Sequence, residues 1–183
     1  MLRNAGLRSP MQLWVGNLVI ATSNFVGVII PVKLIERLGR KLLICISCFG
    51  MICASVMLSL LIMFAAEISA FVPFDPGYLS IAVLVLYVVS FAVGLGPIVG
   101  LMTVELAPSS HRGAVVSVAF SVNYISNLAI AQYANLVVLE VYYFPFAVFC
   151  AFGVLFTCLC VVETKGKNEN EIQTALQRKL NMK

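Results

Sequence analysis

Five long apolar stretches constrain most strongly how this chain can fold. They lie at Met11–Ile35, Leu42–Ala66, Tyr78–Met102, Gly113–Leu139 and Tyr142–Val162. Each stretch can cross a bilayer as a helix, because about 20 apolar residues rising about 1.5 Å each span the hydrocarbon core. Almost all charged residues lie between the stretches or at the ends of the chain. We therefore predict an all-α integral membrane protein with five transmembrane helices.

The composition excludes an ordinary water-soluble domain. The chain is 61% hydrophobic and 11% charged, with a mean hydropathy of +1.02, whereas soluble domains are about 25% charged. The net charge of +4 is modest, and it fits membrane topology better than nucleic-acid binding. Transporters built from two repeats have even numbers of helices, so five stretches indicate a piece of a larger protein.

The basic residues predict the orientation in the membrane. The first and third connections and the C-terminal tail carry ten of the twelve Lys and Arg residues, so these parts are expected to face the cytoplasm. Residues 1–10 then form an extracellular segment (the remnant of a preceding helix), residues 11–162 the transmembrane domain, and residues 163–183 a cytoplasmic tail. In the tail, the four-residue spacing of Ile172, Leu176 and Leu180 predicts a short helix at the membrane surface over Asn168–Leu180.

No catalytic or metal site is expected. All six cysteines lie inside predicted spans, where we expect them to pack as small apolar residues. A redox or metal role for the C-x-x-C pair Cys45 and Cys48 would need a polar setting and further ligands. His111 is interpreted as a plain loop residue. With no P-loop for ATP, the chain is predicted to be neither an enzyme nor dependent on a cofactor.

Three clusters at the ends of the spans each combine an acid with a nearby base. They are Glu36–Lys41, Glu105 with Arg112, and Glu163–Lys167. Topology alone explains one such cluster, whereas three favour ion pairs between helix ends, at a depth where the dielectric constant is intermediate. The predicted network consists of Glu36, Arg37, Arg40, Glu105, Arg112 and Glu163.

The clusters resemble motifs of the sugar porter family of the major facilitator superfamily, in its facilitative glucose transporter form. Glu36-Arg37-Leu38-Gly39-Arg40-Lys41 is similar to E-R-x-G-R-[RK], Gly94-Leu95-Gly96-Pro97-Ile98 to G-P-G-P-I, Val104-Glu105-Leu106 with Arg112 to A-E-[LI]…R, and Val162-Glu163-Thr164-Lys165-Gly166 to P-E-T-K-G. The resemblance implies that the five stretches are helices eight to twelve of a twelve-helix fold. Substrate would then bind near the midplane, between this half and a missing N-terminal half.

Polar side chains near the middle of the spans have two interpretations. They can contact substrate, or they can join helices by hydrogen bonds. On the first and fourth spans the candidates include Asn24, Asn123 and Asn127. The resemblance implies that Asn24 and Asn123 contact sugar and that Phe91 lines the pocket, while Asn127 is left as a packing residue. Gly100 stands where many relatives have a tryptophan against the substrate, so the preferred sugar stays open.

Gly94, Gly96 and Pro97 weaken the third span. Proline removes an N–H and glycine lowers the cost of bending, so these residues are a candidate hinge, with close helix packing as the alternative. Ala92, Leu95, Val99, Tyr124 and Val162 also depart from the family pattern.

The resemblance implies part of a facilitative uniporter of hexoses or related sugars that works by alternating access in the plasma membrane. Uniport is favoured over proton symport because no carboxylate lies at mid-span. The implied partners are a sugar, the lipid bilayer and the missing N-terminal half, and the isolated fragment is expected to be inactive. One alternative is a non-transporting membrane protein or assembly partner derived from a truncated transporter. Another is a porter for fructose or a polyol.

Overall fold

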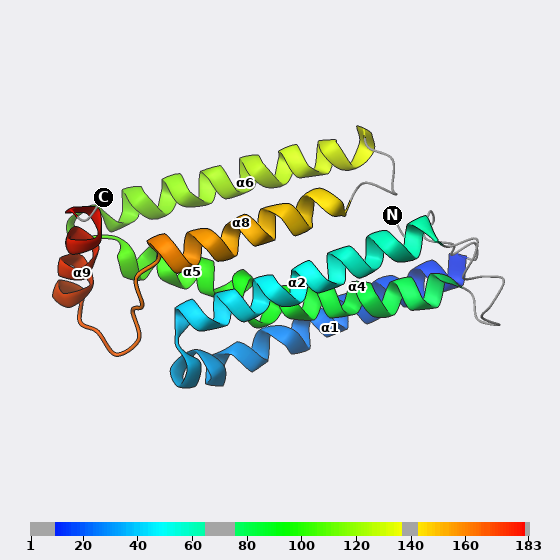
Figure 1. Ribbon diagram of the computed structural model, residues 1–183, viewed down its shortest axis with the longest axis horizontal. Helices are drawn as coiled ribbons and strands as arrows, with labels where there is room; N and C mark the ends of the chain where they lie inside the picture. The colour runs from blue at the N-terminus through cyan, green and yellow to red at the C-terminus, as the bar shows by residue number, and fades with distance from the viewer. Residues whose placement is uncertain (1–9, 65–75, 137–142, 182–183) are drawn as a thin grey trace.

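The chain folds into an elongated bundle of helices (Figure 1). The computed structural model describes residues 10–64, 76–136 and 143–181, and all regular structure in these ranges is helical. The elements are α1 (Pro10–Leu38), α2 (Arg40–Met63), α4 (Pro76–Val93), α5 (Leu95–Leu106), the 3₁₀ turn η1 (Ser109–His111), α6 (Arg112–Leu136), α8 (Phe144–Cys160) and α9 (Glu169–Asn181). This architecture confirms the predicted all-α fold.

The apolar stretches form the long helices of the bundle. Within the described ranges, four segments are long and apolar enough to cross a membrane, namely Trp14–Leu38, Arg40–Met63, Tyr78–Leu106 and Ser109–Tyr133. The fifth, α8, has 17 residues and is therefore about 25 Å long, slightly short of the hydrocarbon thickness. The third stretch is interrupted at Gly94, between α4 and α5. Some of the predicted bounds lie outside the described residues, namely Ala66, Leu139, Tyr142 and most of segment 1–10.

Helix α2 is the centre of the packing. It contacts both α4 and α8 along its length, and it contributes buried residues to both apolar clusters of the bundle. In contrast, α6 has no buried residue in its most apolar window, and α1 has few. Apolar side chains on these two helices are widely exposed, which a bilayer tolerates because lipid tails are as apolar as leucine.

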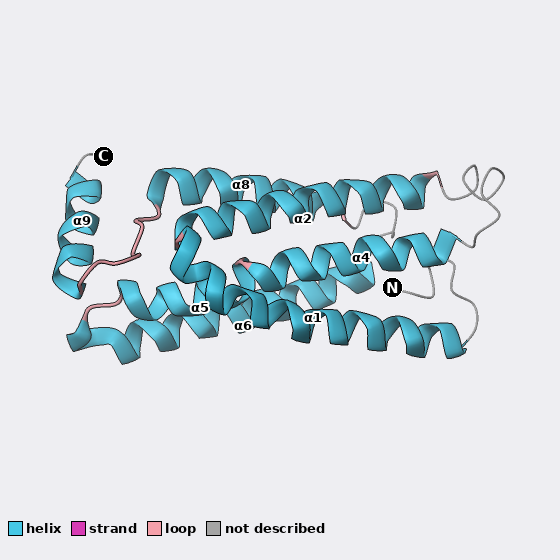
Figure 2. Ribbon diagram, turned by 90° about the horizontal axis from the view of Figure 1, so that it is seen from below, coloured by secondary structure: helices cyan, strands magenta, loops and turns pink. Residues whose placement is uncertain are grey.

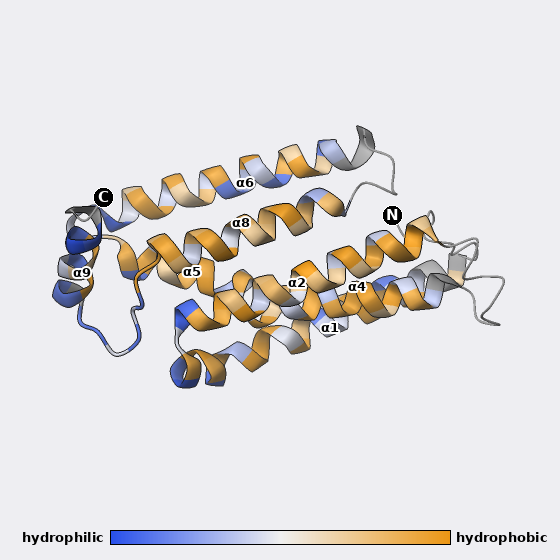
Figure 3. Ribbon diagram, in the orientation of Figure 1, coloured by the Kyte–Doolittle hydropathy of each residue, from blue (hydrophilic) through white to orange (hydrophobic). Residues whose placement is uncertain are grey.

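Polar and charged residues gather at one end of the bundle (Figure 3). We call this end, formed by Gly39, residues 107–111 and residues 161–181, the basic end. Every Lys and Arg that the structure describes lies at or close to it. Helices α1 and α2 meet there at a single residue, Gly39, whose φ of 83° is in the left-handed region that favours glycine.

Helix α9 lies across the basic end (Figure 2). Its bounds, Glu169–Asn181, agree closely with the predicted helix over Asn168–Leu180. Ile172 is buried, and Gln173 Nε2 donates to the carbonyl oxygen of Leu106 at 3.0 Å. Lys179 Nζ donates to the carbonyl oxygen of Val161, just beyond α8, also at 3.0 Å. The described part of the apolar stripe on α9 therefore packs against the ends of the bundle helices.

Candidate functional site

An open cavity of about 770 Å³ lies among α1, α4, α5 and α6. Its walls are mainly apolar, with polar side chains contributed chiefly by α1 and α6. The lining residues are Asn24, Val28, Phe91, Ala92, Leu95, Gly96, Pro97, Val99, Gly100, Thr103, Ala119, Phe120, Val122, Asn123, Ser126 and Asn127. An apolar wall with a few polar groups is typical of small-molecule sites.

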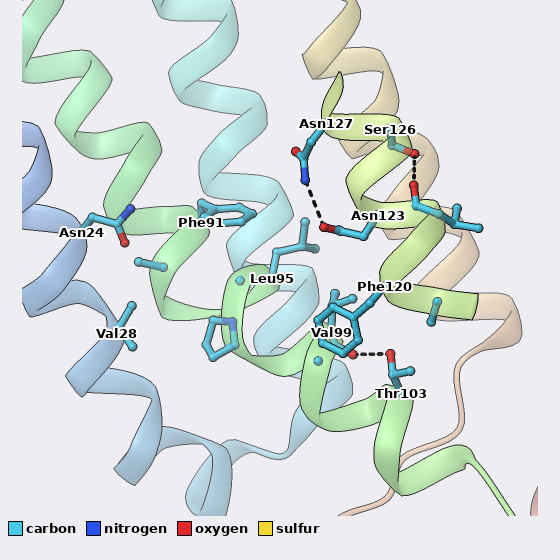
Figure 4. Close-up of a pocket in the computed structure, with 16 residues that line it drawn as sticks. Asn24, Val28, Phe91, Leu95, Val99, Thr103, Phe120, Asn123, Ser126 and Asn127 are labelled. Carbon is cyan, nitrogen blue, oxygen red and sulfur yellow. Dashed lines mark hydrogen bonds between the residues drawn. The ribbon is translucent and has the colours of Figure 1, made fainter. Parts of the chain in front are cut away.

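The structure brings the four predicted substrate residues to this one cavity. Asn24 projects from α1 and Asn123 from α6, on opposite sides of it, with Phe91 of α4 between them (Figure 4). Gly100 lies on the α5 wall. The four residues come from four different helices, and they lie around a common space.

The amides of the cavity retain hydrogen-bonding capacity for a ligand. Asn127 Nδ2 donates to Asn123 Oδ1 at 3.0 Å, so Asn127 pairs within α6 instead of joining two helices. The Asn123 NH₂ group and the Asn127 carbonyl oxygen have no hydrogen-bond partner among the described residues, and both residues line the cavity. Asn24 likewise makes no hydrogen bond within the described part of the chain. Amide groups both donate and accept, which suits hydroxyl-rich ligands.

Gly100 leaves space on the α5 wall. A Cβ atom at this position would contact only the ring of Phe120, at 3.9 Å. A larger side chain therefore has room to grow into the cavity. The size of residue 100 sets how much of the cavity a ligand can fill.

Thr103 was not predicted as a lining residue, and neither were several apolar lining residues such as Val28 and Phe120. The spacing of Gly96, Gly100 and Thr103 places all three on one face of α5, and this signal could have identified Thr103. Its hydroxyl donates to the Val99 carbonyl oxygen at 2.8 Å, so only its oxygen lone pairs remain for a ligand.

The helix break at Gly94 is stabilised by a serine on another helix. Gly94 N–H bonds to the Phe91 carbonyl oxygen at 3.3 Å, so the carbonyl of Ser90 and the N–H of Leu95 lose their usual helical partners. The buried Ser47 of α2 replaces both partners, since its Oγ donates to Ser90 O at 2.7 Å and accepts from Leu95 N at 3.1 Å.

Gly94 also allows α4 and α2 to approach closely. A Cβ atom there would meet the Leu43 carbonyl oxygen at 2.6 Å and would overlap Ser47 Cβ. The structure therefore shows the close packing that we kept as the alternative at this position. Movement about the break stays a prediction.

At the basic end, α2, α5 and the segment after α8 are joined through Glu105. Arg40 Nη2 pairs with Glu105 Oε1 at 2.9 Å, with both side chains about four-fifths buried (18% and 21% exposed). Thr164 Oγ1 donates to Glu105 Oε2 at 2.6 Å. One carboxylate thus holds groups from two distant segments of the chain.

Glu163 caps the N-terminus of α2 from the other end of the sequence. Its two oxygens accept the N–H groups of Arg40 and Lys41, each at 3.0 Å. The first turn of any helix lacks acceptors for these groups and favours negative charge. A Cβ atom at Gly39 would lie 2.9 Å from Glu163 Oε2, so Gly39 is required for both its φ and its closeness to this carboxylate.

The pKa of Glu163 is lowered from its ordinary value of 4.5. Burial by itself raises the pKa of this carboxyl, but backbone N–H donors, with Lys165 and Lys41 first among them, outweigh that effect. The carboxylate form is therefore favoured in the folded chain.

The remaining members of the predicted network take different positions. Arg37 contributes its carbonyl oxygen, which accepts from Lys165 Nζ at 2.7 Å, while its side chain is exposed. Glu36 is exposed and makes no hydrogen bond or ion pair with any residue in the described ranges. Arg112 is half-buried at the start of α6. The basic end thus relies on carboxylate-to-backbone bonds as much as on ion pairs.

Comparison with known proteins identifies the family. Residues 1–176 match the family described as "Sugar (and other) transporter". The chain belongs to this sugar transporter family. It is therefore a multi-pass membrane protein from a family of transporters and not an enzyme.

Relatives in the sugar transporter family cover most of this chain. The facilitated trehalose transporter Tret1 of Bombyx mori is 35% identical over 164 residues, covering 87% of this chain and 32% of its own length. The plastidic glucose transporter 4 of Arabidopsis thaliana is 33% identical over 178 residues, covering 95% and 31%. The chain spans about a third of the length of these curated relatives.

A solved structure shares the fold. The inward-open xylose transporter XylE from E. coli superposes with a TM-score of 0.76 at 21% identity, covering 95% of this chain and 39% of XylE. The bundle is therefore part of a major facilitator fold.

Proposed function

We propose that this chain forms helices eight to twelve of a facilitative sugar transporter, with residues 11–162 as its transmembrane domain and the basic end in the cytoplasm. The cavity is one side of the sugar site, and Asn24, Phe91, Gly100 and Asn123 face the substrate. Hexoses or related sugars are the substrate class, and alternating access is the mechanism. The observation that carries the proposal is the convergence of four separate helices on one cavity lined by amides.

Two further features support the proposal. The described cavity lining contains no carboxylate or other ionisable side chain, which favours uniport over proton-coupled transport. The break between α4 and α5 lies in the cavity wall, so Gly94, Gly96 and Pro97 form the hinge about which α5 moves during alternating access. A second, N-terminal half closes the open side of the cavity. No cofactor is required for this passive mechanism.

We expect Asn123→Ala, made in a complete transporter that contains this chain, to reduce sugar uptake about tenfold. The reason is that a hydrogen bond to a sugar hydroxyl contributes about 1.5 kcal/mol, and its removal leaves that hydroxyl unpaired. Radiolabelled hexose uptake, normalised to surface expression, measures the effect. Ser121→Ala is the matched control, because Ser121 is on the same helix, is absent from the cavity lining and bonds within its own helix. Unchanged uptake in Asn123→Ala would assign Asn123 to packing.

The isolated chain is expected not to transport. Its cavity is open, and α6 has no buried residue in its most apolar window, so nothing in the described bundle closes the pathway on the other side. Liposomes containing only this polypeptide should take up labelled hexose no faster than empty liposomes. Saturable uptake would contradict this expectation and would also remove the need for a second half.

The exposed apolar side chains of α1 and α6 are also consistent with one alternative function, assembly with a partner protein. A non-transporting protein that assembles with a partner through these helices would share the same bundle. Fructose and polyols are alternatives to glucose-like hexoses as the substrate. Plasma membrane is the location that we propose, although several relatives from Arabidopsis thaliana are named for plastids. Imaging of a tagged chain distinguishes the two membranes.

A further inference from the structure

Two cysteines from different helices lie close together near the basic end. Cys45 of α2 and Cys158 of α8 are separated by 113 residues, and their Sγ atoms are 3.9 Å apart. The sequence places Cys45 in a C-x-x-C motif with Cys48, but these two cysteines occupy the same helix one turn apart. The structure therefore assigns Cys45 a partner on another helix.

The surrounding contacts hold this pair of thiols in place. Helices α2 and α8 lie side by side along the bundle (Figures 1 and 2). Lys41 Nζ, one turn before Cys45, donates to the carbonyl oxygen of Cys158 at 2.8 Å. Glu163, just after α8, binds the N–H groups of Arg40 and Lys41. These contacts join the start of α2 to the end of α8, so the two sulfur atoms are kept within reach of each other.

The pair is also accessible. Cys158 is exposed and Cys45 is half-buried, and neither is in a disulfide bond. Cys158 lies two residues before the end of α8, and Cys45 lies in the second turn of α2. Lys41 Nζ bonds to the Cys158 carbonyl oxygen, and a lysine ammonium near a helix end stays at the membrane surface. Both thiols are thus close to the polar end of the bundle, where hydrogen peroxide, a small uncharged molecule, can reach them. The structure describes no group of three or more metal-ligating side chains, which disfavours a metal site here.

We propose that Cys45 and Cys158 form a reversible disulfide that joins α2 to α8 when a peroxide reaches the basic end. The sulfur of the exposed Cys158 thiol attacks one oxygen of hydrogen peroxide and the O–O bond breaks, so a sulfenic acid forms and the departing hydroxide leaves as water with the proton that the thiol gives up. The Cys45 thiol then attacks the sulfenic sulfur, forming the S–S bond and releasing a second water molecule. Two thiols are oxidised and one peroxide is reduced. The sulfur atoms must approach by about 2 Å to reach a disulfide bond length.

The disulfide stabilises the bundle without blocking the cavity. Neither Cys45 nor Cys158 lines it, and the two helices that they join already pack together. A bond between residues so distant in sequence restricts the unfolded chain strongly. The inference is independent of the proposed transport function.

The experiment treats the purified full chain in detergent with hydrogen peroxide, blocks free thiols with maleimide and identifies disulfide-linked chymotryptic peptides by mass spectrometry. We expect a link between the peptides that contain Cys45 and Cys158, with a higher thermal unfolding midpoint that returns to its starting value after reduction. Cys45→Ser and Cys158→Ser should abolish both effects. Cys48→Ala and Cys160→Ser are the matched controls, and both should keep the link.

Three outcomes would overturn the proposal. The first is a disulfide from Cys158 to another cysteine that still forms in Cys45→Ser. The second is a disulfide between Cys48 and Cys150 in place of the expected one. The third is that all cysteines remain free thiols after peroxide treatment. Circular dichroism of each variant before oxidation checks that the helices are intact, so a lost link reports on the thiols themselves.

Discussion

Ser47→Ala is expected to destabilise the bundle by about 2 kcal/mol. The substitution removes the hydroxyl that replaces the missing helical partners of Ser90 O and Leu95 N at the α4–α5 break. Ser47 is 2% exposed, so water does not readily reach these groups, and each buried unsatisfied group costs about 1–3 kcal/mol. We expect the thermal unfolding midpoint in detergent to fall by about 5 °C.

Ser59→Ala provides a close control for this effect. Ser59 is also buried on α2, but its Oγ donates only to the Ser55 carbonyl oxygen of the same helix, at 3.0 Å. That carbonyl keeps its backbone partner after the substitution, so the midpoint should change little. Equal shifts in the two variants would mean that burial of any serine on α2 explains the loss and that Ser47 does not support the break.

Glu163→Ala is expected to destabilise the basic end by about 2 kcal/mol, the upper range for loss of a helix N-cap. The change removes the acceptor of the first two N–H groups of α2 and of Lys165 N. Hydrogen–deuterium exchange should show faster exchange in the first turn of α2, beginning at Arg40. Glu36→Ala is the matched control, because Glu36 is an exposed acid at the same end without a partner in the described ranges. Equal exchange in the two variants would refute the capping role.

The lowered pKa of the Glu163 carboxyl predicts how the stability of the folded chain changes with pH. Its folded pKa is lower than its ordinary value of 4.5, so its stabilising effect is fully present above that value and is lost as the pH falls through the folded pKa. The wild-type chain should therefore become less stable over this acidic range, and Glu163→Gln should show a smaller dependence. An unchanged slope in Glu163→Gln would assign the acid sensitivity to other groups.

Length and hydropathy were sufficient to predict the helices, because a bilayer imposes one length on every span. Gly94, Gly96 and Pro97 were predicted to weaken the third span. The helix is interrupted at Gly94, while movement about this point stays a prediction. The role of Ser47 was not predicted. It depends on how α2 is placed against α4, and serine on a membrane helix usually bonds within its own helix, as Ser23 does.

Glu36 and Glu163 at the basic end also differ in a way that depends on the placement of the helices and not on local sequence. Glu36 and Glu163 have similar sequence surroundings, each close to a run of basic residues, yet only Glu163 reaches the N-terminus of α2. Its partners are backbone N–H groups, which every helix offers and which therefore leave no mark in the sequence. The cavity residues Asn24, Phe91 and Asn123 were predicted from the family resemblance. Phe120 and Val28 were missed because apolar residues on membrane helices face lipid, neighbours or cavities without any change in pattern.

The capping of α2 by Glu163 has a consequence for the synthesis of the chain. The acceptor for the first two N–H groups of α2 lies more than 120 residues later in the chain. Until the ribosome has released the segment after α8, the start of α2 must hold water or lipid headgroups as temporary partners. The junction between α1 and α2 is therefore completed only after α8 has been made, although it enters the membrane before α4, α5, α6 and α8.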